Sequence, residues 1–206
     1  MVESGFSEDH LDVLKELMNI AVGNATASIA DLLQTFGTMH IPQIMISDMV
    51  GLDAYIKNAI PEEKQYYITK QLFGGIFSGE FLFVICENSA INLGRHLYDV
   101  NQNPTDEDIH DAVIELTNIL SATIISRLTE ELNTKVQFFV PSTERIVGNS
   151  IIGQDELLNY HKIIIISTEM VFEDQQIGGK IFILTKDEMI KKLKALIDQK
   201  LEELYA

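Results

Sequence analysis

Two long stretches of the chain carry apolar residues at helical spacing. They run roughly from Ser7 to Thr35 and from Thr105 to Leu132, and their apolar positions recur every three or four residues, which is typical of amphipathic helices. Ser7 followed by two acidic residues, and Thr105 with Asp108 three positions later, are typical helix start signals. The pattern therefore predicts two long helices, one in each half of the chain.

Short apolar runs rich in β-branched residues follow each long helix and predict strands. They read PQIMIS, KQYYITKQLF and GEFLFVICE in the first half, and KVQFFV, KIIIIS and KIFILT in the second. The segments GGIFSG and EDQQIGG are predicted hairpin turns, and each half closes with another helix, the last being DEMIKKLKALIDQKLEELYA. This order predicts an α+β fold with a largely antiparallel sheet.

Four residue types recur in the two halves at one spacing. The first set and its counterparts 99 residues later (111 − 12 = 99) are Asp12, Glu16, Asn19 and Pro42, then Asp111, Glu115, Asn118 and Pro141. Beyond the predicted turns the offset is 100, since Gly79 matches Gly179 and Leu93 matches Leu193, as expected if one turn gained a residue. We therefore predict a single domain over 1–206 made of two repeats, about 7–100 and about 105–206, joined by residues 100–108.

Composition and charge narrow the classes of partner. The chain has 206 residues, 46% of them hydrophobic, which is enough for a sizeable core. Its 31 acidic against 15 basic residues give a formal net charge of −16, which disfavours nucleic acid and anionic membrane surfaces as partners. The acidic surface is interpreted mainly as a solvated one, with contact to a basic feature of a partner as the alternative.

The sequence also predicts a cytoplasmic location. Cys86 is the single cysteine, so an internal disulfide is excluded, and its apolar surroundings predict that it is buried. No apolar run approaches the ~20 residues that span a bilayer, and the start MVESGFSEDH lacks the order of a signal peptide. We therefore expect no membrane insertion.

The repeated residues form a narrow polar stripe on each long helix. Asp12, Glu16 and Asn19 are spaced i, i+4, i+7, which places them within about 60° of one another on one face. Gly23 continues that face, and Ala122 holds the matching position of the second helix. An ordinary solvent-exposed face is the alternative interpretation, but such a face tolerates almost any polar residue, whereas these residues persist where their neighbours differ.

The residue types in the stripe restrict its chemistry. No Ser–His or Cys–His pairing accompanies it, and the five histidines show no metal-ligand spacing. The side chain of Asn offers one acceptor and two donors, so it can orient a water molecule, and Glu can pair with a cation on a partner. This combination suits the hydrolysis of an already reactive bond, such as an acyl phosphate.

The pattern Asp-x3-Glu-x2-Asn-x22-Pro resembles the signature of the CheC/CheX/FliY family of chemotaxis phosphatases. Both copies fit at all four positions, and two complete copies in about 200 residues are most similar to the CheC branch. The resemblance implies two sites related by pseudo-two-fold symmetry. Its implied substrate is a phosphorylated CheY-type response regulator.

The resemblance also implies a role for each motif residue. Glu16 and Glu115 would contact the active-site lysine of the receiver domain, while Asn19 and Asn118 would enter its active site and position water for in-line attack. The supporting motif positions are Asp12, Pro42, Asp111 and Pro141. Mg²⁺ would be supplied by the receiver, so the chain is expected to have no cofactor of its own. CheD, a receptor-modifying deamidase, is a further implied partner. A non-catalytic module that docks a receiver domain or CheD is the competing hypothesis.

Overall fold

The computed structural model describes residues 6–62, 64–98, 104–148, 151 and 162–205. The helices that it describes are α1 (Glu8–Leu33), α2 (Met49–Ala59), α3 (Glu87–Tyr98), α4 (Asp106–Glu131) and α6 (Asp187–Tyr205). The strands are β1 (Thr38–Met39), β2 (Gln43–Ser47), β3 (Gln65–Gly75), β4 (Gly79–Cys86), β5 (Val136–Phe138), β6 (Ser142–Val147), β7 (Ile163–Phe172) and β8 (Ile177–Lys186).

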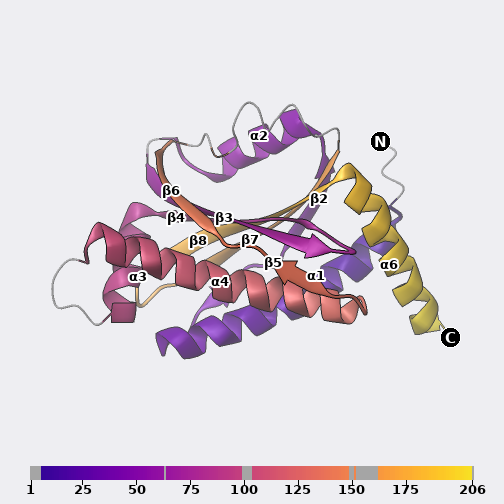
Figure 1. Ribbon diagram of the computed structural model, residues 1–206, viewed down its shortest axis with the longest axis horizontal. Helices are drawn as coiled ribbons and strands as arrows, with labels where there is room; N and C mark the ends of the chain where they lie inside the picture. The colour runs from indigo at the N-terminus through magenta and orange to yellow at the C-terminus, as the bar shows by residue number, and fades with distance from the viewer. Residues whose placement is uncertain (1–5, 63, 99–103, 149–150, 152–161, 206) are drawn as a thin grey trace.

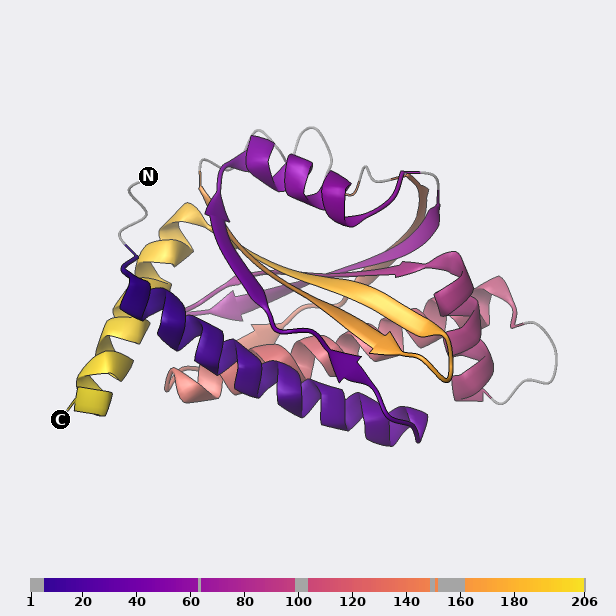
Figure 2. The same ribbon diagram turned by 180° about the vertical axis from the view of Figure 1, so that it is seen from behind.

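All eight described strands belong to one antiparallel sheet. Its order is β1-β7-β8-β4-β3-β5, with β2 also pairing β7 and β6 also pairing β3. Helices cover both faces: α1 and α4 lie side by side and run in opposite directions on one face, and α2 lies on the other (Figures 1 and 2). The predicted α+β class with a largely antiparallel sheet is confirmed.

Strands of each half pair with the other half of the chain. The short strands β1 and β2 pair with β7, and β5 and β6 pair with β3. At the centre of the sheet β4 pairs with β8, where Leu82 lies opposite Phe182, its counterpart at the offset of 100. Two repeats related by pseudo-two-fold symmetry would pair in this way. The superposition of the two halves stays a prediction, and part of the predicted joint, residues 99–103, lies outside the described residues.

The predicted start signals are confirmed as helix caps. The side chain of Ser7 accepts a hydrogen bond from the backbone N–H of His10, and Thr105 forms a capping box with Asp108. Hydrogen bonds from the Thr105 side chain and backbone lower the pKa of Asp108. Both long helices are 26 residues long. Their observed ends lie within about two residues of the predicted ends.

The sequence pattern missed three described elements, α2, β6 and the two-residue strand β1, and it missed the exposure of the cysteine. The helix α2 was not predicted because its apolar residues, Leu52 and Ile56 among them, fill only one narrow face above the sheet. The strand β6 has no buried position and no strong apolar run. The prediction that Cys86 is buried is wrong: the residue ends β4, is partly exposed, and lies 3.4 Å from Ser89 Oγ.

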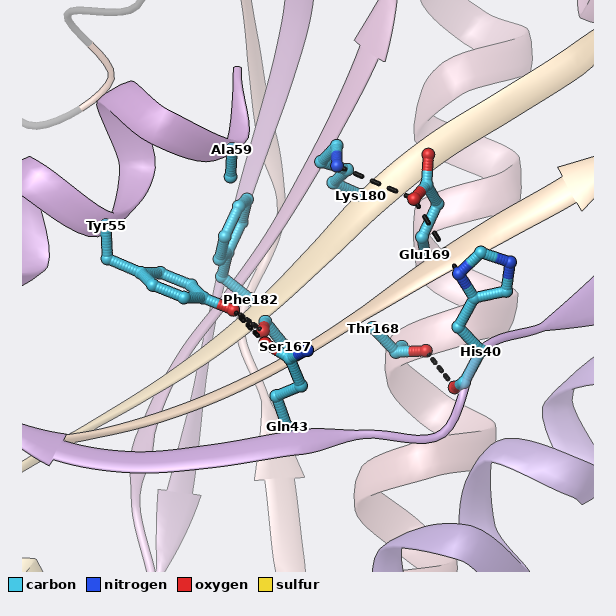
Figure 3. A pocket seen from close by; sticks show the side chains of 9 residues that line it. All are labelled: His40, Gln43, Tyr55, Ala59, Ser167, Thr168, Glu169, Lys180 and Phe182. Carbon is cyan, nitrogen blue, oxygen red and sulfur yellow. Dashed lines mark hydrogen bonds and ion pairs between the residues drawn. The ribbon is translucent and has the colours of Figure 1, made fainter.

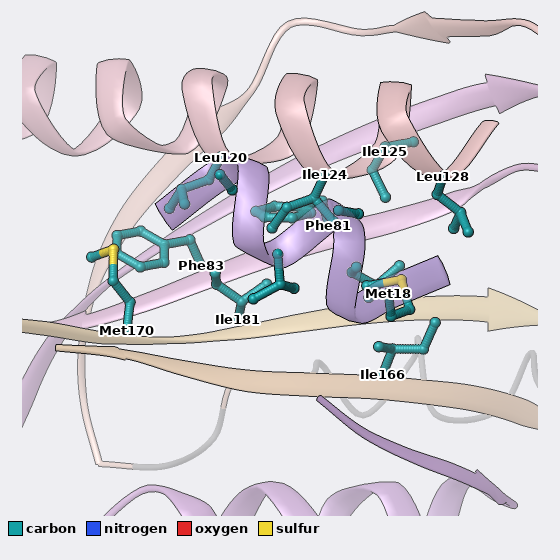
Figure 4. Packing of buried hydrophobic residues seen from close by; sticks show 14 of the residues in the cluster. Met18, Phe81, Phe83, Leu120, Ile124, Ile125, Leu128, Ile166, Met170 and Ile181 are labelled. Carbon is teal, nitrogen blue, oxygen red and sulfur yellow. The ribbon is translucent and has the colours of Figure 1, made fainter. Parts of the chain in front are cut away.

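The main core lies between the sheet and the pair α1 and α4 (Figure 4). Phe81 and Phe83 of β4 are fully buried there, beside Met18 of α1 and Ile124 of α4. Among the described residues, α4 alone is long and apolar enough to cross a membrane by length and composition. More than half of its most apolar window is buried against the protein (56%), as expected of a core helix.

A hydrogen bond ties the start of α1 to α6. The Ser7 N–H donates to His10 Nδ1, so Nε2 carries the ring proton and donates to Asp198 Oδ1 at 2.6 Å. The hydrogen bond from His10, with a second from Lys194, lowers the pKa of Asp198 below its ordinary value of 3.8. Ionised Asp198 therefore contributes stability above that value, and the contribution is lost as the pH falls through the lowered pKa.

Replacing Asp198 by Asn is expected to lower the thermal unfolding midpoint at neutral pH. The difference from wild type should disappear at a pH below the lowered pKa, where wild-type Asp198 is protonated. Thermal unfolding at neutral and acidic pH measures this. The matched control is Asp53→Asn, which disrupts an exposed 2.7 Å pair with Lys57 inside α2 alone. Equal destabilisation by Asp198→Asn at both pH values would contradict the assignment.

Candidate functional site

Both polar stripes lie on the outer surface of the paired helices. The side chains of Glu16 and Asn19 on α1, and of Glu115 and Asn118 on α4, are all exposed. Each of them has one buried neighbour in the chain, Leu17 or Met18 on α1 and Leu116 or Thr117 on α4. The packing of these neighbours against the sheet fixes which face of each helix carries the stripe. Both Glu/Asn pairs are therefore accessible to a partner, as the contacts implied by the family resemblance require.

The two glutamates differ from the aspartates that precede them on the stripe. Asp12 lies 3.2 Å from Lys15 Nζ, and Asp111 lies 3.5 Å from His110 Nδ1. Within the described part of the chain, neither Glu16 nor Glu115 has a cation within ion-pair distance. Both carboxylates are therefore available to a cation from outside the protein.

The small residues beside the stripes leave open space. A Cβ built on Gly23 would meet no atom within 4 Å outside its own helix backbone, so packing does not require glycine at this position. Ala122 is likewise exposed on α4. Both positions give another molecule room to approach the asparagine side chains.

The motif prolines open the edge strands next to each site. Pro42 precedes β2 and is buried, and Pro141 precedes β6 and is half-buried. In each half, the backbone carbonyl two residues before the proline accepts a hydrogen bond from a side chain on a strand of the other half. Thr168 donates to the His40 carbonyl at 2.5 Å, and Gln71 donates to the Phe139 carbonyl at 3.0 Å.

The two asparagines have different surroundings. Gln71 Nε2, on β3, donates to Asn118 Oδ1 at 3.1 Å, and Ser121 Oγ donates to Gln71 Oε1. The side chain of Asn19 has no hydrogen bond with another residue that the structure describes. The sequence did not single out Gln71, because it lies 47 residues from Asn118. Its only signal was a polar residue at an inward position of an apolar strand.

Tyr98 borders the second stripe. Burial raises the pKa of its hydroxyl, and the negative charges of Glu115, Asp111 and Asp108 raise it further. The side chain is 40% exposed at the end of α3. The hydroxyl therefore stays protonated at neutral pH and adds a hydrogen-bond donor near Glu115.

A polar pocket of about 120 Å³ lies between α2 and the sheet (Figure 3). Its polar groups satisfy one another: Tyr55 contacts Ser167, and Lys180 lies 3.6 Å from Glu169. No group of three or more His, Cys, Asp or Glu side chains could hold a metal ion in the described part of the chain. The stripes thus remain the strongest candidate site.

The chain is similar in sequence to a known CheY-P phosphatase. It is 22% identical over 202 residues to the CheY-P phosphatase CheC of Bacillus subtilis strain 168, covering 92% of this chain and 94% of that protein. No protein-family model matches the chain.

Three solved structures extend the comparison to the fold. Thermotoga maritima FliY has a TM-score of 0.74 at 16% identity, covering 97% of this chain and all of that one (100%). CheX from Desulfovibrio desulfuricans has a TM-score of 0.57 at 13% identity, covering 83% and 99%. The FliM middle domain from H. pylori has a TM-score of 0.59 at 12% identity, covering 93% and 99%. The predicted resemblance to the CheC/CheX/FliY family is thus confirmed, in sequence by a CheC and in fold by FliY and CheX.

Proposed function

We propose that the chain is a phosphatase that hydrolyses the aspartyl phosphate of a CheY-type response regulator in chemotaxis signalling. The observation that carries the proposal is the presence of two exposed Glu/Asn pairs, each on one of two adjacent antiparallel helices. The similarity to the CheY-P phosphatase CheC over 92% of the chain supports the same substrate class.

In the proposed reaction each glutamate anchors the receiver domain. Glu16 and Glu115 have no cation partner among the described residues, so each can pair with the receiver's active-site lysine. The chain supplies no metal ligand set among those residues, and Mg²⁺ belongs to the receiver in this proposal. The anchor brings the adjacent asparagine to the phosphoryl group.

The asparagine then orients the attacking water. Its amide offers both donors and an acceptor. By holding a water molecule in line with the phosphorus, the amide fixes an orientation that a water from bulk solvent would reach only rarely. The phosphoryl group leaves the receiver aspartate as inorganic phosphate, and the chain forms no covalent intermediate. Asn19 and Asn118 each serve one site.

A docking module is the second candidate function. The fold is shared with the FliM middle domain as well as with FliY and CheX, so the fold by itself does not select hydrolysis. An exposed amide at the same position of both helices favours the enzyme, because docking alone requires no amide at that position. CheD is a further partner in this proposal, and we expect both partners to meet the chain in the cytoplasm.

The direct test follows the phosphoryl group. Incubating the chain with phosphorylated CheY and Mg²⁺ should accelerate loss of the phosphoryl group relative to CheY and Mg²⁺ without the chain. An unaltered decay rate with demonstrable binding would leave the docking module as the function.

Replacing both glutamates by alanine is expected to weaken engagement of the phosphorylated regulator. A charge pair at the rim of an interface acts mainly on the association rate and is screened by salt. Added salt should therefore slow the wild type more than the Glu16→Ala/Glu115→Ala variant, measured as dephosphorylation at limiting regulator. The control is Glu202→Ala, an exposed acid on α6, which should keep the wild-type salt response. The pairing would be refuted by equal salt sensitivity of the wild type and the double variant.

A further inference from the structure

We infer that Gln71 and Ser121 are positioning residues of the second site, which hold the amide of Asn118 in its working orientation. The inference rests on the proposed function and goes beyond it, because neither residue belongs to the repeated motif. It also makes the two sites unequal: the second is preorganised by protein hydrogen bonds, whereas the first has no corresponding support among the described residues.

The three side chains form a continuous hydrogen-bonded chain from the core to the surface. Ser121 is fully buried and Gln71 is 4% exposed, whereas Asn118 is exposed. Ser121 Oγ donates to Gln71 Oε1, and Gln71 Nε2 donates to Asn118 Oδ1 at 3.1 Å. Buried polar groups are costly unless they are paired, so this network strongly favours one arrangement.

The hydrogen-bonding partners determine whether the oxygen or the NH₂ of each amide faces a given group. The backbone carbonyl of Phe139 can only accept, so the Gln71 group facing it at 3.0 Å is the NH₂. The second donor of that NH₂ then requires an acceptor, which is Asn118 Oδ1. The orientation of Asn118 therefore follows from the network.

This arrangement leaves the catalytic groups of Asn118 free. An amide oxygen has two lone pairs, and Gln71 occupies one. The other lone pair and both Nδ2–H donors remain available to water and to a phosphoryl oxygen. Gln71 thus restricts rotation of the amide without consuming the groups that the reaction needs.

The first half lacks the equivalent support. Met170 of the second half is the counterpart of Gln71 (170 − 71 = 99); it is apolar and buried and has no amide to offer Asn19. Thr168 binds the carbonyl two residues before Pro42, but its one hydroxyl proton is donated to His40. Val22 stands where Ser121 stands in the second half (121 − 22 = 99) and is apolar and buried. No described residue holds the Asn19 side chain by a hydrogen bond.

The test isolates each site and then removes the support. In an Asn19→Ala background only the second site works, and adding Gln71→Leu should lower kcat about tenfold, the equivalent of one neutral hydrogen bond, with KM little changed. Ser121→Ala should lower kcat by a smaller factor, since Gln71 keeps its bonds to Phe139 and Asn118. The substrate is phosphorylated CheY with Mg²⁺.

Two controls separate positioning from general destabilisation. Thr69 is buried on β3, two residues from Gln71, and its hydroxyl is hydrogen-bonded to Thr143 of β6 at 2.8 Å. Thr69→Val removes this bond and should leave the second-site rate at the parent value. In an Asn118→Ala background, where only the first site works, Gln71→Leu should not reduce the rate. A fall in both backgrounds would overturn the positioning role.

A conservative variant adds a pH readout. In Gln71→Glu a protonated carboxyl group can donate to Asn118, whereas an ionised one cannot. The ratio of the variant's rate to that of the Asn19→Ala parent, measured at each pH, should be higher at low pH than at high pH. A flat ratio, or an inactive second site beside an active first site, would overturn the inference and leave the proposed function standing. An inactive wild type would contradict both the inference and the proposed function.

Discussion

Replacing Asn19 and Asn118 together by alanine is expected to reduce catalysed dephosphorylation about 10²–10³-fold, the usual effect of removing one preorganised polar group from an active site. Binding of the phosphorylated regulator should remain largely intact, because the glutamates that anchor it are unchanged. The measurement is the dephosphorylation rate of phosphorylated CheY, together with a binding titration of the same variant.

The single variants and a matched control complete this experiment. Each single Asn variant should keep the share of activity that its remaining site supplies, and the second site should supply the larger share if Gln71 holds Asn118 in place. Asn24→Ala, at an exposed position of α1 off the stripe, should retain the wild-type rate. A double variant with a near-wild-type rate would exclude a catalytic role for the two asparagines.

Replacing Phe81 by alanine is expected to lower the free energy of unfolding by about 3–5 kcal/mol. Phe81 is fully buried at the centre of the sheet, where it packs in the cluster that joins α1 and α4 to β4 (Figure 4). Truncation there removes apolar contacts and leaves a cavity under α1 and α4. Urea unfolding at equilibrium measures the change.

The scale of that effect has a functional consequence. Single domains are stabilised by about 5–15 kcal/mol in total, so the variant should be marginally folded and lose activity at both sites. Phe36→Ala, at a side chain that is 94% exposed, is the control and should unfold like the wild type. Similar stability of the Phe81 and Phe36 variants would show that the cluster does not hold the helices in place.

The sequence was sufficient for the parts of the molecule that depend on local patterns. Helical periodicity and the caps at Ser7 and Thr105 placed α1 and α4, and apolar runs placed six of the strands. The i, i+4, i+7 spacing of the stripe correctly implied one exposed face on each helix. These features follow from residues close together in the chain.

Features that depend on distant residues could not be read in this way. The edge strands β1 and β2 of the first half pair with β7 of the second half. No pattern of neighbouring residues predicts such pairing. Gln71 reaches Asn118 only because β3 passes beneath α4. The motif repeat indicated two similar sites, whereas the contacts of Asn118 and Asn19 differ because strands from opposite halves support them with different residues.

The proposed activity is catalytic turnover of a phosphorylated receiver domain. The most direct measurement is phosphate release from phosphorylated CheY with Mg²⁺ when the regulator is present in large molar excess over the chain. We expect each chain to release many phosphates, at a rate that the Asn19→Ala/Asn118→Ala variant does not match. Decay at the rate of the regulator alone, or release that stops at one phosphate per site, would contradict this activity.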